Sequence, residues 1–222
     1  MDPIASRPSA YILLGPPGSG KSTQADYFGR EFGAAHIDMG AALRSAAAEP
    51  TPFGAALSDI INNRRELVSD GIVRSILENE LRKVGASRPV IIDGAPRCGS
   101  QVHVVISAIE ESGRTFREAV FIDLSEEDSI TRISRRFSCS ECGRKLILGA
   151  DLRTASSPCP VCGGEVSQRQ DDTEEGVRTR FRVFRDETVP VIGYFEAEGK
   201  LLRVPGNKTA EAIWGDIRAA LI

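Results

Sequence analysis

The feature that most constrains this chain is a glycine-rich octapeptide at residues 15–22, Gly-Pro-Pro-Gly-Ser-Gly-Lys-Ser, which follows the apolar run 11–14. Its three glycines let the backbone curve closely around a phosphate, so that N–H groups and the positive end of a following helix face the anion. Lys21 adds a mobile cation. An ordinary glycine-rich turn is the alternative, but the preceding strand pattern and the following helical pattern favour a phosphate-binding loop. We therefore expect the chain to bind a nucleoside triphosphate.

Bulk composition narrows the class of protein. The chain has 222 residues, of which 41% are hydrophobic, enough for a sizeable buried core. A net charge of −3 argues against a general affinity for nucleic acid. Residues 1–9 carry two prolines and no apolar core, so they do not resemble a signal peptide, and no stretch approaches the roughly 18 apolar residues of a membrane span. We expect a cytoplasmic enzyme with no nucleic-acid or membrane partner.

Short apolar runs that end in turn or acidic residues recur along the chain and are typical of buried parallel strands, at 11–14, 35–38, 90–93, 120–124 and 201–204. Segments with helical periodicity lie between them. This alternation predicts an α/β fold, a doubly wound parallel five-stranded sheet flanked by helices. In such folds ligands bind at the carboxyl ends of the strands, where the phosphate loop also lies.

Two helices are predicted in the second half of the chain. Ser125 and Asp128 form a plausible capping box for a helix that continues through Phe137. A longer helix is expected from Thr173 to about Glu198, with a capped start and one narrow apolar stripe. Arg180 falls beside that stripe and is expected to face the interior. Four other arginines are interpreted as solvated surface residues, namely Arg136, Arg178, Arg182 and Arg185.

Two stretches interrupt the alternation of strands and helices. Residues 39–67 look wholly helical, whereas residues 136–171 are rich in Cys, Gly, Ser and Pro. Both are interpreted as insertions into the core. The second is too poor in apolar residues to fold on a hydrophobic core alone.

The cysteine-rich insertion contains two CxxC pairs separated by sixteen residues, each followed by glycine, at Cys139, Cys142, Cys159 and Cys162. Two such turns can present four sulfurs tetrahedrally, which is typical of a structural zinc site. A redox dithiol and buried free cysteines are the alternatives, and thiolates also accept iron or cobalt. Because four thiolates leave no open coordination position, we expect the metal to stabilise the insertion rather than to react.

A second motif, Asp93-Gly94-Ala95-Pro96-Arg97, follows a buried strand and therefore lies at the same sheet edge as the phosphate loop. A carboxylate in that position can hold Mg²⁺ directly or through water. An ordinary turn after a strand is the alternative, and the neighbouring phosphate loop makes the magnesium interpretation the stronger one.

Taken together, these motifs resemble the adenylate kinases of the nucleoside monophosphate kinase family, in the long form whose lid binds zinc. The similarity spans nearly the whole chain and includes, in order, the phosphate loop with Thr23-Gln24, Gly40 to Arg44, Leu67-Val68-Ser69-Asp70, Asp93 to Arg97 with Gln101, Arg132 with Arg135-Arg136, the two CxxC pairs, Arg169-Gln170-Asp171-Asp172 and Arg180.

The resemblance implies reversible, Mg-dependent phosphoryl transfer from ATP to AMP, giving two ADP. The catalytic residues that it implies are Lys21, Arg97, Arg132, Arg135, Arg169 and Arg180. The implied ATP site comprises Gly15, Pro16, Pro17, Gly18, Ser19, Gly20, Lys21, Ser22, Thr23, Arg132 and Gly206. The implied AMP site comprises Met39, Gly40, Arg44, Val68, Gly94, Arg97, Gln101, Arg169 and Arg180. Asp93 and Ser22 would hold magnesium through water, and Asp171 with Asp172 would help to lock the lid.

The resemblance also divides the chain. We expect a core made of residues 1–38, 68–134 and 173–222, a monophosphate-binding insertion at 39–67 and a zinc-binding lid at 135–172. The insertions would close over both substrates and exclude water, about hinges near Asp38, Val68, Ser134 and Asp172. We expect a monomer whose only partners are small nucleotides.

The acceptor site departs from the family pattern, because Met39 stands where a small hydroxyl residue is usual and Ala41 where an acid is usual. Methionine offers packing but no hydrogen-bond donor, which would loosen discrimination among monophosphates. UMP, CMP or GMP are therefore alternative acceptors, and Asp38 could accept a hydrogen bond from a guanine edge. Gln101 is retained, which favours adenine.

Two hypotheses from other classes remain open at this point. In one, the chain is a nucleotide-dependent binding module whose zinc ribbon contacts nucleic acid, although the acidic balance opposes this. In the other, the chain binds nucleotides but transfers the phosphoryl group slowly, because its acceptor site has degraded.

Overall fold

A computed structural model describes residues 7–64, 67–168 and 172–221. The chain forms two compact units, which are described separately below. The larger unit takes in residues 1–15, 20–123 and 184–222, and the smaller takes in residues 16–19 and 124–183, in each case as far as they are described.

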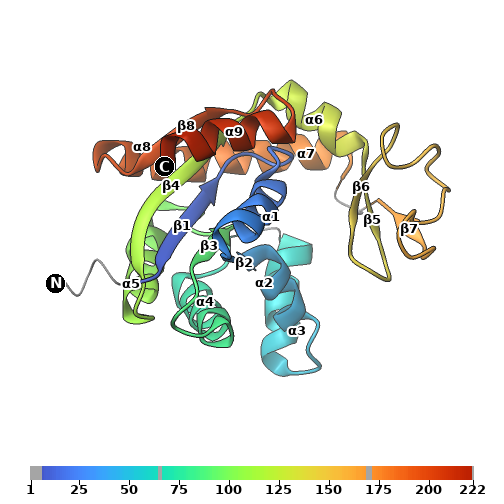
Figure 1. The fold of residues 1–222 in the computed structure, drawn as a ribbon. Coiled ribbons are helices and arrows are strands. Elements are labelled where there is room, and N and C mark those ends of the chain that lie inside the picture. Colours follow the sequence, from blue (N-terminus) through green and yellow to red (C-terminus); the bar gives the residue numbers. More distant parts are fainter. Residues whose placement is uncertain (1–6, 65–66, 169–171, 222) are drawn as a thin grey trace. The chain divides into compact units, whose positions relative to one another are not determined.

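The larger unit is built on a five-stranded parallel sheet of order β2-β3-β1-β4-β8, whose strands are labelled in Figure 1. The strands are β1 (Ser9–Leu14), β2 (Ala35–Asp38), β3 (Val90–Asp93), β4 (Thr115–Asp123) and β8 (Leu201–Pro205). All five predicted strands are present, and the predicted fold class is confirmed. The order places β3 and β4 on either side of β1, so that the strand before the phosphate loop is central.

Helices pack on both faces of this sheet because successive strand residues point to opposite sides and both sides are apolar. Ile12 and Leu14 belong to one buried cluster, whereas Leu13 between them belongs to the other. The same alternation separates Ile92 from Ile91 in β3. The helices of this unit include α1 (Lys21–Phe32), α4 (Asp70–Val84), α5 (Gly99–Glu111), α8 (Val189–Ala197) and α9 (Ala210–Leu221).

The stretch predicted to be wholly helical is helical over most of its described part, but a bend at residues 48–51 interrupts it. It contains α2 (Met39–Ala47), α3 (Pro52–Ser58) and the π-helical turn η1 (Asp59–Arg64). Asp38 caps α2, accepting a hydrogen bond from the backbone N–H of Ala41 at 2.9 Å. Leu43 and Leu57 are buried in the same cluster as one face of the sheet, so these helices share the core of the larger unit.

In its described residues, the smaller unit contains two helices and a three-stranded antiparallel sheet of order β6-β5-β7 (Figure 1). Its elements are α6 (Glu126–Ser134), β5 (Arg136–Cys139), β6 (Lys145–Ile147), β7 (Val166–Ser167) and α7 (Glu174–Val183). The buried cluster behind the sheet comprises Phe137, Cys139, Leu146, Leu152 and Cys159. Two of these residues are cysteines, and the cluster is smaller than either cluster of the sheet unit.

Two helix predictions need correction. The helix predicted to continue through Phe137 ends at Ser134, because Phe137 enters β5 opposite Leu146 and buries its ring in the small cluster. The helix predicted from Thr173 to about Glu198 consists of α7, the π-helical turn η2 (Phe184–Thr188) and α8, which begins with proline at its first turn. Proline lacks the N–H that a continuous α-helix would use there.

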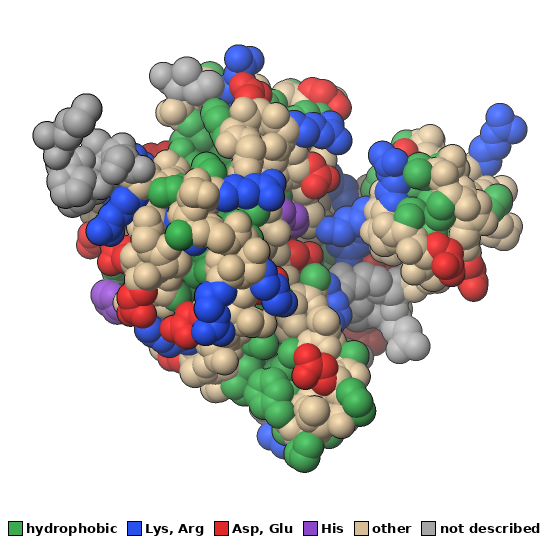
Figure 2. All heavy atoms as spheres, turned by 60° about the horizontal axis from the view of Figure 1, so that its bottom comes forward, with side chains coloured by type: hydrophobic (Ala, Val, Ile, Leu, Met, Phe, Trp, Pro, Cys, Tyr) green, Lys and Arg blue, Asp and Glu red, His purple; other side chains and the backbone are tan. Residues whose placement is uncertain are grey.

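None of the helices in the described residues is long and apolar enough to cross a membrane. On the face drawn in Figure 2, Lys and Arg side chains are interspersed with Asp and Glu side chains. This mixture agrees with the small net charge of −3.

Candidate active site

The phosphate loop ends at a helix whose N-terminus suits an anion. Gly20 precedes α1 with φ 93°, a conformation that side chains other than glycine rarely adopt, and among the described residues no side chain caps this helix end. The dipole of α1 favours an anion at this end of the helix. Lys21 Nζ donates to the carbonyl oxygen of Gly15, the first residue of the loop, at 2.8 Å.

Gly18, in the smaller unit, is required by packing as well as by conformation. Its φ is 75°, and a Cβ atom here would lie 3.0 Å from Cγ1 of Ile133 and 3.3 Å from the carbonyl oxygen of Ser129. Both neighbours belong to α6. A side chain at position 18 would therefore push the loop away from this helix.

A hydroxyl group and a carboxylate meet at the carboxyl end of β3. Ser22 Oγ donates to Asp93 Oδ2 at 3.0 Å, and Asp93 is the last residue of β3. Burial acts to raise the pKa of Asp93, but His36, Lys21 and the Ser22 hydroxyl lower it more, so this pKa lies below its usual value. An ionised carboxylate beside a hydroxyl is an oxygen donor set of the kind that Mg²⁺ prefers, so both residues fit the predicted magnesium role.

Two arginines of the predicted monophosphate site each approach one of two neighbouring glycines. A Cβ atom at Gly40 would lie 3.1 Å from Nη1 of Arg44. At Gly94, which has φ 91°, it would lie 3.6 Å from Nη2 of Arg97 and 3.5 Å from the backbone nitrogen of Gly40. A side chain at either glycine would thus crowd a guanidinium group.

The backbone of Arg97 is fixed from both sides. Gln101 Oε1 accepts from its N–H at 2.8 Å, and Thr188 Oγ1 donates to its carbonyl oxygen at 2.8 Å. Gln101 also donates through Nε2 to the carbonyl oxygen of Val68 at 3.1 Å and is only 2% exposed. Met39 is fully buried in the core, so its side chain packs among apolar neighbours. The predicted base contacts of Met39, Val68 and Gln101 stay predictions.

Gly206 lies after β8 with its backbone N–H donating to the carbonyl oxygen of Asp123 at 2.6 Å. A Cβ atom here would lie 2.7 Å from that same oxygen, so only glycine fits. The loop is thereby held at the carboxyl end of the sheet, the edge at which ATP contacts are predicted.

The smaller unit holds an arginine pair around one buried carboxylate. Asp172, whose side chain is 1% exposed, accepts from Arg136 Nε at 3.0 Å and Nη2 at 2.7 Å, and from Arg180 Nη2 at 2.9 Å. The interpretation of Arg136 as a solvated surface residue was wrong, because its guanidinium is committed to this buried partner. Sequence spacing gave no sign of the pairing.

The other arginines predicted for this unit lie in different surroundings. Arg135 is exposed and donates through Nε to the carbonyl oxygen of Leu148 at 3.0 Å. Arg132 is half-buried near the end of α6. Arg169 and Asp171 lie outside the described residues. The convergence of the six predicted arginines on one pair of nucleotides stays a prediction.

The four cysteines come together as the spacing predicts. Their sulfur atoms all lie within 4.8 Å of one another, with 3.5 Å between Cys139 and Cys162 and 3.7 Å between Cys142 and Cys159. Sulfurs about 2.3 Å from one tetrahedral zinc ion lie about 3.8 Å apart, so the cluster fits that ion. The two turns are alike, because the glycine after each pair donates its N–H to the carbonyl oxygen of the first cysteine.

The cysteine cluster also has the electrostatics of a metal site. Backbone N–H groups of Val161 and Cys162 lower the pKa of Cys159 to about 7. At Cys162 the Gly164 N–H acts to lower the pKa, but neighbouring sulfurs such as Cys139 raise it more, to about 12. Four thiols this close cannot all ionise without a cation, which a divalent metal would supply.

Comparison of the sequence with known proteins gives information about its family that does not depend on the structure. Residues 13–200 match the family model described as Adenylate kinase. A curated adenylate kinase of Petrotoga mobilis is 37% identical over 202 residues, covering 91% of this chain and 92% of that protein. Adenylate kinases of Archaeoglobus fulgidus and Geobacter sp. strain M21 are each 35% identical over 210 residues, covering 95% of this chain and 96% and 98% of those proteins.

Proposed function

The chain belongs to the adenylate kinase family, and from this premise we propose which of its residues carry out the transfer of a phosphoryl group from ATP to AMP. The reaction joins two polyanions and needs little acid–base chemistry from the protein, so that positioning and neutralisation of charge dominate. The single observation that carries the proposal is the hydrogen bond from Ser22 to Asp93, which joins the phosphate loop to the motif that carries Arg97.

On the donor side, we assign the phosphates of ATP to the loop 15–23, with Lys21 holding the β- and γ-phosphates. The uncapped start of α1 and the left-handed glycines support this assignment. Arg132 would contact the base and phosphates of ATP, and the loop at Gly206 would border the base. Magnesium, when bound through Ser22 and Asp93, would neutralise phosphate charge and orient the transferred group.

On the acceptor side, we assign the phosphate of AMP to Arg44 and Arg97. The closeness of both guanidinium groups to Gly40 and Gly94 supports this assignment, since planar guanidinium forks bind phosphate oxygens in pairs. Gln101 would read the base. Because its amide already fixes the backbone of Arg97, recognition of adenine and placement of the phosphate would be linked through one side chain.

We propose that the two insertions act as flaps, residues 39–67 over the monophosphate and residues 135–172 over the triphosphate. Arg135, Arg169 and Arg180 would then close around the transferred group. A structural zinc ion held by the four cysteines would keep the second flap folded while it moves. We also propose a cytoplasmic monomer, since four reduced thiols around a metal belong to a reducing compartment.

The acceptor is tested by a coupled assay that measures ADP formation from ATP with AMP, UMP, CMP and GMP in turn. We expect AMP to have the highest kcat/KM, and Gln101→Ala to lower kcat/KM for AMP more than for UMP. Met39→Thr, which restores a small hydroxyl residue, serves as the matched variant for the departure from the family pattern. If AMP proves the poorest of the four acceptors, the assignment of the acceptor fails.

A further inference from the structure

A cluster of one histidine and two aspartates lies beside the phosphate loop, and the roles proposed above use only one of its members. The candidate ligand atoms of His36, Asp38 and Asp93 all lie within 4.8 Å of one another. The backbone explains why they meet. His36 and Asp38 are two residues apart in β2 and so share one face of the sheet, and Asp38 pairs in register with Asp93 of β3.

This arrangement places two carboxylates at directly opposite positions of neighbouring strands, where like charges are destabilising. Lys21 offsets part of the charge on Asp93, whose low pKa keeps it ionised. Asp38 uses Oδ1 to cap α2 through the N–H of Ala41, and its second oxygen is not needed for that cap. A further cation would therefore be stabilised between the two carboxylates.

The imidazole of His36 determines which cation fits. Its Nε2 atom is buried and has no hydrogen-bond partner among the described residues, and it lies 3.7 Å from Oδ2 of Asp93. That separation is too long for a hydrogen bond but suits two ligands of one ion. Ligand atoms about 2.0–2.2 Å from a metal lie up to about 4.4 Å apart, so the side chains need to shift by about an ångström or less.

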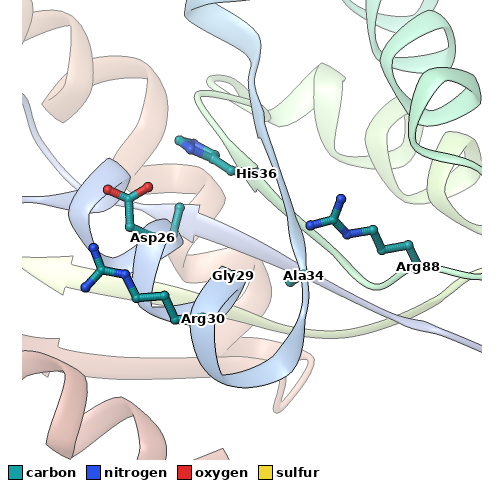
Figure 3. Close-up of a pocket in the computed structure, with 7 residues that line it drawn as sticks. Asp26, Gly29, Arg30, Ala34, His36 and Arg88 are labelled. Carbon is teal, nitrogen blue, oxygen red and sulfur yellow. The ribbon is translucent and has the colours of Figure 1, made fainter. Parts of the chain in front are cut away.

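An ion could reach this cluster through an open hollow of about 440 Å³ that His36 helps to line. Figure 3 shows His36 extending from β2, with Asp26 and Arg30 of α1 on one side in this view and Arg88 on the other. Because His36 belongs both to the lining of this hollow and to the cluster with the two carboxylates, the hollow offers an ion a route to the imidazole.

We propose that His36, Asp38 and Asp93 form a second metal site, which takes a divalent first-row transition ion such as Zn²⁺, Co²⁺ or Mn²⁺. One imidazole nitrogen with two carboxylates suits these ions, whereas Mg²⁺ is held by oxygen ligands alone. Water would complete the coordination. Because the ion would share Asp93 with the magnesium position, excess transition metal would slow the enzyme, but the site itself does not depend on phosphoryl transfer.

The test uses full-length protein whose lid is already loaded with zinc, without magnesium or nucleotide, so that neither the cysteines nor ATP compete. Cobalt(II) chloride is titrated in and followed by calorimetry, while NMR follows the two histidine rings of the chain. We expect one cobalt ion to bind and paramagnetism to broaden the ring signals of His36 but not those of His103.

Three variants assign the ligands. His36→Gln and Asp38→Asn should each weaken cobalt binding at least tenfold, and asparagine keeps the cap on α2 because its side-chain oxygen also accepts from Ala41. His103→Gln, which removes the exposed histidine of α5, should leave binding unchanged. The proposal is overturned if no cobalt binds beyond the lid, if cobalt binds only by releasing lid zinc, or if both Asp38→Asn and His36→Gln bind like the unmodified chain.

Discussion

The parallel-sheet unit and the cysteine-rich end of the smaller unit are held together by different physical means. In the sheet unit, apolar side chains from both faces of every central strand are buried. They form two large hydrophobic clusters, one on each face of the sheet. Among the described residues around β5, β6 and β7, the buried cluster is smaller, and it includes Cys139 and Cys159 of the predicted metal site. The sequence specifies the sheet unit through its hydrophobic pattern and the cysteine-rich region through the spacing of four cysteines.

This difference predicts that each of the two regions can unfold while the other remains folded. Hydrophobic stabilisation is spread over dozens of side chains, so a single substitution removes a fraction of it. A metal site concentrates its stabilisation in one ion and four bonds, so the loss of one ligand removes most of it. The predictions below perturb one region and monitor both.

The largest effect is expected from removal of one thiolate. Structural zinc sites contribute about 10–16 kcal/mol of apparent binding free energy, so Cys142→Ser should lose the metal and unfold β5 to β7. Hydrogen exchange should show lost protection over residues 136–167, with β1 and β3 still protected. Cys98→Ser removes the cysteine outside the cluster and should change neither region. If residues 136–167 stay protected after zinc is lost, the apolar cluster alone is sufficient to keep β5 to β7 folded, and the prediction is wrong.

The next largest effect concerns catalysis with the fold intact. Lys21→Met removes the loop cation, and the loss of one group that stabilises a transferring phosphoryl costs on the order of 10³-fold in kcat. Zinc content and hydrogen-exchange protection should remain as in the unmodified chain. The measurement is the initial rate of ADP formation at saturating ATP and AMP. A decrease in kcat smaller than tenfold would contradict the assignment of Lys21 as a catalytic residue.

A cavity in the sheet unit should cost more than the same truncation in the metal-held region. Leu77 is fully buried in α4, so Leu77→Ala should lower the free energy of unfolding by about 3 kcal/mol. Leu146→Ala in β6 should cost less in the zinc-loaded protein, because the metal holds the turns on either side. Urea denaturation followed by tryptophan fluorescence and by zinc release separates the two regions. Equal losses would argue against a metal-dominated lid.

The buried carboxylate between two arginines should show an intermediate effect. Asp172→Asn leaves Arg136 and Arg180 without their common counter-charge and should cost about 2 kcal/mol, since the arginines keep some contact with water. Asp186→Asn breaks an exposed pair with Arg185 and is the matched control, with an expected change below about 0.5 kcal/mol. The melting temperatures of the two variants are measured side by side. Similar values would contradict the larger loss of stability expected for Asp172→Asn.

The smallest effect is a pH dependence confined to the sheet unit. The pKa of Asp93 is lowered in the folded chain, so its ionised form contributes stability above the unfolded pKa near 3.8, and this contribution is lost as the pH falls through the folded value. Urea midpoints at pH 6 and pH 3.5 should therefore differ less for Asp93→Asn than for the unmodified chain. An equal difference in both proteins would mean that Asp93 titrates normally.

Much of the sheet unit could be predicted because its strands are short apolar runs bounded by turn residues. Val90–Asp93 is one such run, and its strand boundaries agree with the prediction. The cysteine cluster was predictable for a similar reason, since two CxxC turns leave few ways to arrange four sulfurs. In both cases the information is local to the sequence.

What could not be predicted depends on distant partners. Phe137 fits a helical pattern with Ile133, but pairing with β6 overrides that periodicity. Arg136 looks like a surface residue until Asp172, 36 positions later, is seen to accept from it. Thr188 lies within the segment predicted to form one long helix, and only the fold reveals that its hydroxyl group donates to the backbone carbonyl of Arg97.

The most direct test of the account is a crystal structure of the zinc-loaded protein with a dinucleotide in which two adenosines are joined by five phosphates. We predict that Arg44 and Arg97 contact the phosphate at the acceptor end and that Arg132 contacts phosphates at the donor end. Arg135, Arg169 and Arg180 should contact the phosphates between them, around the position of the transferred group. If these guanidinium groups instead point to separate surfaces while the dinucleotide is bound, the proposed assignment of catalytic residues is contradicted.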